Sequence, residues 1–473
     1  MKNTKMGFLA AALALPLALS ACGGSTTSEG SSSAAAAGGS AAASAAGSAA
    51  APAGDISGEI QYWLWDSNQQ PAYTQCAKDF MAANPNVTVK IQQYGWDDYW
   101  EKIRTGMVAG TAPDVFTDHL AFFPEFVANE QLLGYNDLIA RDSVDTGIYQ
   151  EGLAELWKDQ NGQTYGLPKD FDTIALFYNK KMADEAGVTA DQLGSLTWNP
   201  TDGGTFEKTI AHLTVDKNGK RGDEAGFDKD NVAVYGLWME GSGGGDGQTQ
   251  WSMYTGSNGW KSTDAQTWGT SYNYDKPEFQ DTITWWKSLA DKGYMPSFEK
   301  QAGVSWNDAL AAGKVASATN GSWMIGSVFG AKSDKFEPAV APTPVGPSGQ
   351  RASMFNGLAD SIYVGTKNPD AAWAWVKYLG SAACQDVVGK AGVVFPAIPS
   401  GTDLAQAAFL AKGADVEPFL THVKEGTTFL FPITDHKSEV GAIMTPAMEA
   451  VMSGKAEVSS LTEANTQVNA LFE

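Results

Sequence analysis

Acidic, amide and aromatic side chains that could hold a ligand stand where the chain leaves two segments of apolar, strand-like sequence. Asp66 and Asn68 follow the first of these segments, directly after Trp65. Asp118 and His119 end the second segment. In α/β proteins, ligands bind at the carboxyl ends of strands. Carboxylates accept charge-assisted hydrogen bonds, and an aromatic ring offers a flat apolar surface, so we expect a ligand to be held near these strand ends.

The segments that would position these side chains alternate between strand and helix patterns. The sequence predicts strands at residues 59–65, 87–91 and 113–119. Apolar residues at helical spacing fill the two intervals, at 71–83 and 96–108. A β-α-β-α-β order with short connections predicts a parallel sheet with helices on both faces, which places both groups of polar residues on one rim of that sheet.

Composition indicates a large folded protein and narrows the class of ligand. The chain has 473 residues, of which 43% are hydrophobic and 11% aromatic, enough for two domains or more. Its 54 acidic and 32 basic side chains give a net charge of −22. This charge opposes binding to nucleic acid or to anionic lipid, so we expect a neutral or cationic ligand. The same charge could instead serve solubility alone.

Residues 1–22 have the pattern of an export signal. Lys2 and Lys5 precede an apolar stretch too short to span a bilayer, and Leu-Ser-Ala stands immediately before Cys22. These last four residues resemble a bacterial lipobox, which implies that Cys22 is acylated and becomes the first residue of a lipid-anchored protein. An ordinary signal peptide, cleaved before Cys22, is the alternative. Residues 23–54 are almost entirely Gly, Ser, Ala and Thr and predict a flexible tether.

Several segments, taken in order, resemble the extracellular solute-binding proteins of carbohydrate ABC importers, the family that includes the maltose-binding protein. The segments are residues 59–65, 109–115, 173–180, 313–323, 342–347, 356–364 and 368–373. No single segment is specific. The ordered set, together with the lipobox and the tether, carries the resemblance, which covers the chain from Glu59 to its end.

The resemblance implies a two-lobed, periplasmic-binding-protein-like α/β fold. Each lobe would be a mostly parallel sheet flanked by helices, and the lobes would close over a ligand about a hinge with two or three crossings. The implied boundaries are 55–169 with 361–409 for lobe one, 173–356 with 410–473 for lobe two, and 170–172 with 357–360 for the hinge.

The resemblance also implies which residues face the cleft and bind a neutral carbohydrate, with an oligosaccharide as the expected ligand. The candidates are Trp65, Asp66, Asn68, Asp118, His119, Phe171, Asp172, Trp238, Glu240, Trp323, Asn356 and Asp360. Those at or beside the family's sugar-contacting positions are Asp66, Asp118, Asp172, Glu240 and Trp323. A Trp after a Gly-Ser turn, such as Trp323, is poorly explained as core. Trp65 could instead pack in the core, Asp66 and Asp172 could cap helices, and His119 could be structural.

The partners implied by the resemblance are an oligosaccharide and the permease subunits of an ABC importer. No cofactor and no nucleic acid is expected, and the membrane is reached only through the lipid anchor. We expect a monomer without catalytic activity. A glycoside hydrolase would need two carboxylates flanking the sugar bond, for which Asp118 and Glu240 are the candidates. A cell-surface carbohydrate-binding adhesin would show repeats or a β-rich pattern. No motif in this sequence supports either alternative.

Two smaller features leave alternatives open. Cys76 and Cys384 could form a disulfide, which an extracytoplasmic location permits, or could be two small buried residues. The loop that carries Asp216, Asn218 and Asp223 has oxygen ligands beside a glycine turn, as calcium loops do, but it departs from the EF-hand spacing. We therefore expect no metal site and keep this loop as a weak calcium candidate.

Overall fold

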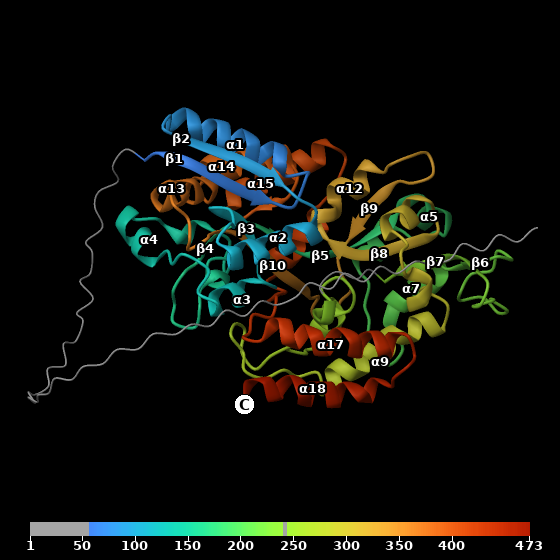
Figure 1. The fold of residues 1–473 in the computed structure, drawn as a ribbon. Helices are drawn as coiled ribbons and strands as arrows, with labels where there is room; N and C mark the ends of the chain where they lie inside the picture. Colours follow the sequence, from blue (N-terminus) through green and yellow to red (C-terminus); the bar gives the residue numbers. More distant parts are fainter. Residues whose placement is uncertain (1–55, 240–243) are drawn as a thin grey trace, which may run out of the picture. The chain divides into compact units, whose positions relative to one another are not determined.

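The computed structural model describes residues 56–239 and 244–473. The predicted lipidation site Cys22, the export signal, the tether and the candidate Glu240 lie outside the described residues and stay predictions. Within the described ranges, two β-sheets with helices packed around them form two lobes (Figure 1). We call the seven-stranded sheet and its helices lobe one, and the five-stranded sheet and its helices lobe two.

Lobe one has the strand order β11-β4-β10-β3-β1-β2, with β12 beside β10. Its strands are β1 (Gly58–Leu64), β2 (Val87–Gln93), β3 (Val115–His119), β4 (Gly166–Asp172), β10 (Ser353–Ile362), β11 (Phe395–Pro396) and β12 (Thr428–Leu430). The helices between and after these strands are α1 (Gln70–Ala83), α2 (Trp96–Ala109), α3 (Phe123–Ala128), α4 (Asn136–Asp142), α13 (Pro369–Leu379), α14 (Ala382–Ala391), α15 (Pro399–Ala411) and α16 (Glu417–Glu425).

Lobe two has the strand order β6-β7-β8-β5-β9. Its strands are β5 (Ile174–Asn179), β6 (Val215–Asp216), β7 (Val232–Trp238), β8 (Val315–Gly321) and β9 (Pro338–Ala341). Its helices are α5 (Lys180–Glu185), α6 (Ala190–Gly194), α7 (Gly204–Leu213), α8 (Ser252–Ser257), α9 (Pro277–Asp291), α10 (Phe298–Gln301), α11 (Trp306–Ala311), α12 (Ile325–Gly330), α17 (Lys437–Met452) and α18 (Leu461–Asn469). Two short 3₁₀-helices, η3 (Gly244–Asp246) and η4 (Ser322–Met324), contribute residues to the candidate ligand-binding cavity.

The β-α-β-α-β opening is confirmed. β1 pairs in parallel with β2 and with β3. Helix α2 ends at Ala109, and Gly110 caps it with a left-handed φ of 72°, a conformation that glycine adopts without steric cost. Pro113 then fixes the backbone just before β3, so the strand begins at a defined point. This connection makes His119 the last residue of β3.

Both sheets are mixed rather than mostly parallel, which corrects the expectation for each lobe. In lobe one, β10 runs antiparallel to both β3 and β4. In lobe two, β5 is antiparallel to β8 and β9, whereas β7 and β8 pair in parallel. Consecutive β-α-β units dictate parallel pairing for the strands that they contain. A strand that returns from the other lobe, such as β10, enters the sheet in the opposite direction.

The chain passes from one sheet directly to the other at Thr173. Strand β4 belongs to lobe one, and β5, which starts at Ile174, belongs to lobe two. Thr173 is buried, and its hydroxyl donates to the carbonyl of Phe419 at 2.8 Å. Residues 357–360, expected at the second crossing, lie inside β10 and pair with strands of lobe one. The return to lobe one therefore occurs before β10 begins, while the hinge itself stays a prediction.

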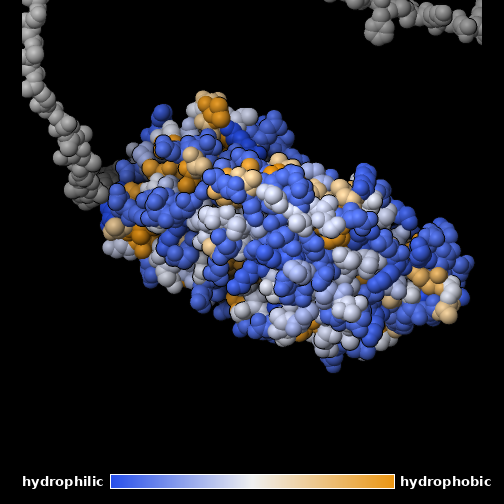
Figure 2. Space-filling model, turned by 90° about the horizontal axis from the view of Figure 1, so that it is seen from below, coloured by the Kyte–Doolittle hydropathy of each residue, from blue (hydrophilic) through white to orange (hydrophobic). Residues whose placement is uncertain are grey.

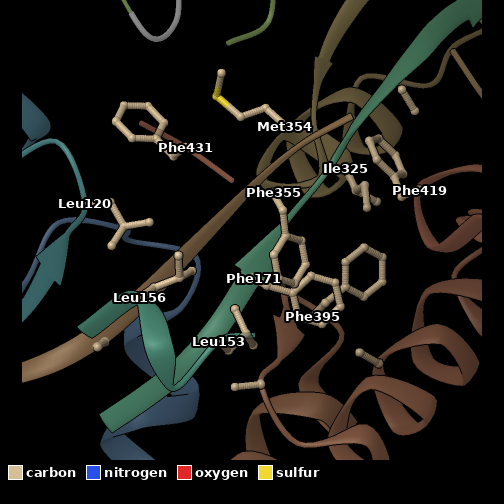
Figure 3. Packing of buried hydrophobic residues seen from close by; sticks show 14 of the residues in the cluster. Leu120, Leu153, Leu156, Phe171, Ile325, Met354, Phe355, Phe395, Phe419 and Phe431 are labelled. Carbon is tan, nitrogen blue, oxygen red and sulfur yellow. The ribbon is translucent and has the colours of Figure 1, made fainter. Parts of the chain in front are cut away.

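A shared apolar cluster joins strands of the two lobes near Thr173 (Figure 3). Phe171 stacks on Phe395 with ring centroids 5.7 Å apart, and it lies 5.2 Å from Phe355. On the lobe-two side, Phe177 contacts Phe419 at 5.4 Å. Because such rings bury large apolar areas in defined geometries, this cluster fixes the strands that leave and re-enter lobe one.

Hydrophilic residues cover most of the face shown in Figure 2, with apolar residues in scattered patches. This surface agrees with the net charge of −22. Among the helices of the described ranges, none combines the length and the apolar character that a membrane crossing requires.

The structure pairs Cys76 with Cys384 in a disulfide. The bond joins α1 to α14, and the two Cα atoms are 5.3 Å apart, within the usual range for such a bond. The two cysteines are 308 residues apart in sequence. The disulfide therefore ties the first helix of lobe one to a helix formed after the chain has passed through lobe two.

The carboxylates of the calcium candidate loop are engaged in hydrogen bonds within the protein. Both oxygens of Asp216 already accept backbone N–H groups, Oδ1 that of Asn218 at 2.8 Å and Oδ2 that of Asp228 at 2.9 Å. Asp223 instead pairs with His212 at 2.8 Å. Within residues 56–239 and 244–473, no group of three His, Cys, Asp or Glu side chains could hold a metal. The acidic residues of this loop stabilise its turns.

Candidate ligand-binding cavity

A cavity of about 680 Å³ is lined by residues of both lobes. This volume falls in the usual range for sites that bind small molecules. Its walls come from the chain after β1, the ends of β3 and β4, the segment around η3, the segment from η4 into α12, and strand β10. The lining residues are Trp65, Asp66, Ser67, Asn68, Gln69, Trp96, His119, Ala121, Asp172, Gly244, Asp246, Gln248, Trp323, Met324, Ser327, Asn356, Leu358 and Phe431.

A second hollow, of about 1050 Å³, lies beside α13. Asp142 in its wall already accepts hydrogen bonds from Arg141, Trp373 and Lys377. These charged groups are engaged in holding α4 to α13, so they are not available to a ligand. We therefore take the cavity between the lobes as the candidate site.

Most of the residues predicted from the sequence meet in this cavity. They are Trp65, Asp66, Asn68, His119, Asp172, Trp323 and Asn356. They come from β1, β3, β4, η4 and β10 or the turns that follow these elements. The fold therefore brings together positions that are up to about 290 residues apart in the chain.

Asp118 does not line the cavity, contrary to the prediction. Its side chain is fully buried in β3, where Oδ1 accepts the backbone N–H of His119 at 2.8 Å and Oδ2 accepts the Ser361 hydroxyl at 3.0 Å. Burial raises the pKa of Asp118 to about 8. Because successive side chains of a strand point to opposite faces, only one of two neighbours can face the cavity, and here it is His119.

Phe171, Trp238 and Asp360 are also interior and do not line the cavity. Phe171 and Trp238 pack in the shared apolar cluster. Asp360 accepts a hydrogen bond from the Tyr62 hydroxyl at 2.8 Å and lies 3.8 Å from the Lys169 ammonium. Burial raises the pKa of Asp360. These three residues stabilise the interior, so the structure gives no support to their predicted contact with a ligand.

Tryptophan side chains from both lobes line the cavity. Trp65 is half-buried and meets Trp96 edge to face, with ring centroids 5.1 Å apart. Trp96 is 43% exposed and is the first residue of α2. Trp323, in η4 directly after β8, contributes from lobe two. Trp96 was not among the predicted residues, although it follows β2 at the same edge of the sheet as Trp65 follows β1.

His119 is a neutral side chain in the cavity wall. Its Nδ1 accepts the backbone N–H of Ala121 at 3.0 Å, and its Nε2 lies 2.9 Å from the side-chain amide of Asn356. Burial, aided by the charge of Lys437, lowers the pKa of His119 to about 3. The imidazole therefore takes part in hydrogen bonds without adding a positive charge to the site.

Asp172 stands at the end of β4, next to the Thr173 crossing. Its Oδ1 accepts the hydroxyl of Ser322 at 2.8 Å, and the backbone N–H of Ser322 donates to the carbonyl of Thr173 at 3.0 Å. Burial, aided by the nearby Asp66, raises the pKa of Asp172 to about 7. Because Ser322 immediately precedes Trp323, the carboxylate of lobe one holds the turn that presents this tryptophan.

The lining residue Asp246 belongs to an ion pair that the sequence did not reveal. Lys437, the first residue of α17, donates to both oxygens of Asp246 at 2.7 Å. Both side chains are buried, and the ammonium lies 5.1 Å from the ring of Phe431. A buried ion pair of this kind keeps both charges matched inside the protein. Other lining residues were not predicted from the sequence. Gln69 and Met324 belong to the turns after β1 and β8 that carry Asp66 and Trp323, whereas Gln248 and Ser327 lie in segments without a strand-exit signal.

Aromatic rings, carboxylates and amides around one cavity suit reversible binding of a hydroxyl-rich solute. A family model described as bacterial extracellular solute-binding protein matches residues 75–417. The chain belongs to this family. Membership confirms the resemblance found in the sequence segments and places this solute-binding protein among extracellular binding proteins rather than enzymes.

Relatives of known sequence and structure agree with this assignment. The solute-binding protein is 25% identical over 317 residues to the maltodextrin-binding protein of Bacillus subtilis, a match that covers 66% of this chain and 67% of that one. UspC of M. tuberculosis superposes with a TM-score of 0.69 at 25% identity, covering 87% of this chain and 99% of UspC. An ABC substrate-binding protein of Listeria monocytogenes, solved in complex with cycloalternan, gives a TM-score of 0.71 at 19% identity and covers 87% and 98%. These similarities confirm the two-lobed, periplasmic-binding-protein-like fold.

Proposed function

We propose that this solute-binding protein captures a neutral oligosaccharide in the cavity between its lobes and delivers it to the permease of an ABC importer. The observation that carries the proposal is a single cavity lined by Trp65 of lobe one, Trp323 of lobe two and the Asp172 carboxylate at the crossing. An aromatic ring stacks on the C–H face of a sugar ring, and a carboxylate accepts hydrogen bonds from its hydroxyl groups.

The charge of the cavity favours a neutral ligand. Asp66, Asp172 and Asp246 line it, and the Lys437 ammonium behind Asp246 is already paired with that carboxylate. A sugar that carries a carboxylate, sulfate or phosphate would meet negative charge, and among the described lining residues there is no Lys or Arg to balance it. Two similar proteins, a maltodextrin-binding protein and one solved with cycloalternan, support the oligosaccharide class.

The placement of the tryptophans on different lobes supports closure around the ligand. A ligand that contacts Trp65 and Trp323 together stabilises the arrangement in which the lobes lie close to each other, and so raises its population. In this proposal the chain rotates near Thr173, and the permease recognises the closed form. Acylation at Cys22, followed by the tether at 23–54, would hold the protein at the extracytoplasmic face of the cell membrane.

The two alternatives have less support. A glycoside hydrolase would use Asp118 as one of its carboxylates, but this side chain is interior and bonded to Ser361. The adhesin alternative calls for repeats or a β-rich pattern, whereas the described chain forms two helix-covered sheets.

Isothermal titration calorimetry against a panel of plant, host and milk oligosaccharides tests the proposal. We expect saturable heat with at least one neutral oligosaccharide and none with its uronic-acid counterpart. The Asp118→Asn variant is the control, because Asp118 lies outside the cavity and its replacement should leave the affinity unchanged. Heat from amino acids or peptides, with none from any sugar, would overturn the assignment.

A further inference from the structure

The contacts of His119 determine which of its ring nitrogens carries a proton. Nδ1 accepts the backbone N–H of Ala121 at 3.0 Å. A ring nitrogen that accepts a hydrogen bond carries no proton, so the single proton of the neutral imidazole must be on Nε2. Protonation at Nδ1 would break the contact with Ala121, and burial, aided by the charge of Lys437, lowers the pKa of His119 to about 3.

The Nε2–H donor of His119 conflicts with one orientation of the neighbouring amide. The Asn356 nitrogen Nδ2 lies 2.9 Å from Nε2, so two donors face each other, while the buried Oδ1 of Asn356 has no hydrogen-bond partner. An asparagine amide has nearly the same shape when its oxygen and nitrogen exchange places, so the hydrogen-bond network decides between the two orientations. Half a turn of the amide places Oδ1 opposite the Nε2–H and removes both conflicts.

Asp172 is the nearest acceptor, by strand register, for the amino group of the turned Asn356 amide. Asn356 stands directly opposite Asp172 in the antiparallel pair of β10 and β4, so the two side chains share one face, and both line the cavity. The Cβ atoms of directly opposite residues are about 5 Å apart, a separation that an asparagine and an aspartate can bridge. The Ser322 hydroxyl already donates to Oδ1 of Asp172, which leaves Oδ2 for the Asn356 amino group.

We propose that His119 is a positioning residue, which acts through Asn356 to orient the Asp172 carboxylate in the cavity. Nε2–H of His119 holds Oδ1 of Asn356, and the Asn356 amino group then donates to Asp172. The series of contacts runs from β3 through β10 and β4 to Ser322, the residue before Trp323. Its effect on ligand affinity rests on the proposed function. The tautomer of His119, in contrast, is a property of the ligand-free protein.

NMR of the full chain labelled with ¹⁵N-histidine tests the first step without any ligand. The chain has four histidines, and the His119→Gln variant assigns the His119 signal by its loss. We expect the long-range ¹H–¹⁵N pattern of the Nε2–H tautomer from about pH 5 to about pH 8, the range in which an ordinary histidine gains its charge. The Nδ1–H tautomer, or a ring that becomes protonated in this range, would overturn the proposal.

Affinity for the sugar identified by calorimetry tests the second step. In His119→Gln, an amide N–H donor replaces Nε2–H, and the affinity should stay within about threefold of the wild type, whereas His119→Leu removes the donor and should weaken binding about tenfold. His212→Gln is the matched control, since His212 pairs with Asp223 outside the cavity and this variant should bind like the wild type. Thermal melts check that each variant is folded.

The two measurements separate this proposal from the proposed function. Equal affinities of the Gln and Leu variants at position 119 would overturn the positioning role. If the wild type bound no sugar at all, the proposed function would fail, and the tautomer measured by NMR would still decide whether His119 orients Asn356.

Discussion

Replacing Asp118 by Asn should make the protein more stable than the wild type at mildly alkaline pH. The Asp118 side chain is fully buried, and burial raises its pKa from 3.8 to about 8. Between these two values the folded state holds a proton that the unfolded state releases, so the free energy of unfolding falls as the pH rises. One pKa unit corresponds to about 1.4 kcal/mol, so the free energy of unfolding can fall by at most about 5 kcal/mol by pH 8.

The asparagine variant avoids this loss because its side chain cannot ionise. Its carbonyl oxygen can still accept the backbone N–H of His119, and its amino group can donate to the Ser361 hydroxyl. The two proteins should therefore have similar stability only at about pH 3.5 or below, and the advantage of the variant should already be measurable at about pH 5 and grow toward pH 8. Urea unfolding followed by tryptophan fluorescence at about pH 5, 6.5 and 8 measures this difference.

Asp142→Asn provides a control of opposite sign. Hydrogen bonds from Arg141, with others from Lys377 and Trp373, hold the pKa of Asp142 well below its usual value. Its stabilising contribution is therefore complete above about pH 5, and the variant should lose the same free energy at all three pH values. An advantage of Asp118→Asn that does not change with pH, or that shrinks as the pH rises, would refute the reasoning.

Trp323→Ala should weaken oligosaccharide binding by about 1 to 3 kcal/mol in calorimetry, whereas Trp323→Phe should keep most of the affinity; an unchanged Ala variant would remove this ring from the site. Cys76→Ser should lower the melting temperature, because it removes a cross-link between residues 308 apart in sequence. The loop entropy of the unfolded chain accounts for about 5 kcal/mol of stabilisation by such a bond. Equal melting temperatures of variant and wild type would contradict this prediction. Lys169→Met should destabilise the fold by about 3 kcal/mol or more in urea unfolding, because Asp360 loses its cation. Adding Asp360→Asn should restore part of that stability, and no restoration would show that the two side chains are not coupled. Cys22→Ser should release the protein from the membrane fraction into the medium, and retention would contradict lipidation at this position.

Local sequence patterns predict the fold well where strands and helices alternate over short distances. The alternation at 59–65 and the helical spacing at 96–108 correspond to β1 and α2, and the pairing of the opening strands is parallel as expected. The direction of β10 has no such local signal, because it depends on how the chain returns from lobe two. The pairing of Cys76 with Cys384 likewise depends on the packing of α1 against α14 rather than on a motif.

The candidate site is predictable where a polar or aromatic residue directly follows a strand. Asp66 after β1 and Trp323 after β8 line the cavity for this reason. The rule fails for Asp118, because a shift of one residue along a strand reverses the face on which the side chain lies. Asp246 and Phe431 line the cavity from segments where no periodic pattern marks them, so only the three-dimensional arrangement shows their place.

A crystal structure of the protein with an oligosaccharide that calorimetry shows to bind is the most direct test of a sugar site between the lobes. We expect a sugar ring stacked on Trp65 or Trp323, with one of its hydroxyl groups within hydrogen-bond distance of the Asp172 carboxylate. A ligand bound outside this cavity, or one held in it without contact to either tryptophan, would contradict the proposed function.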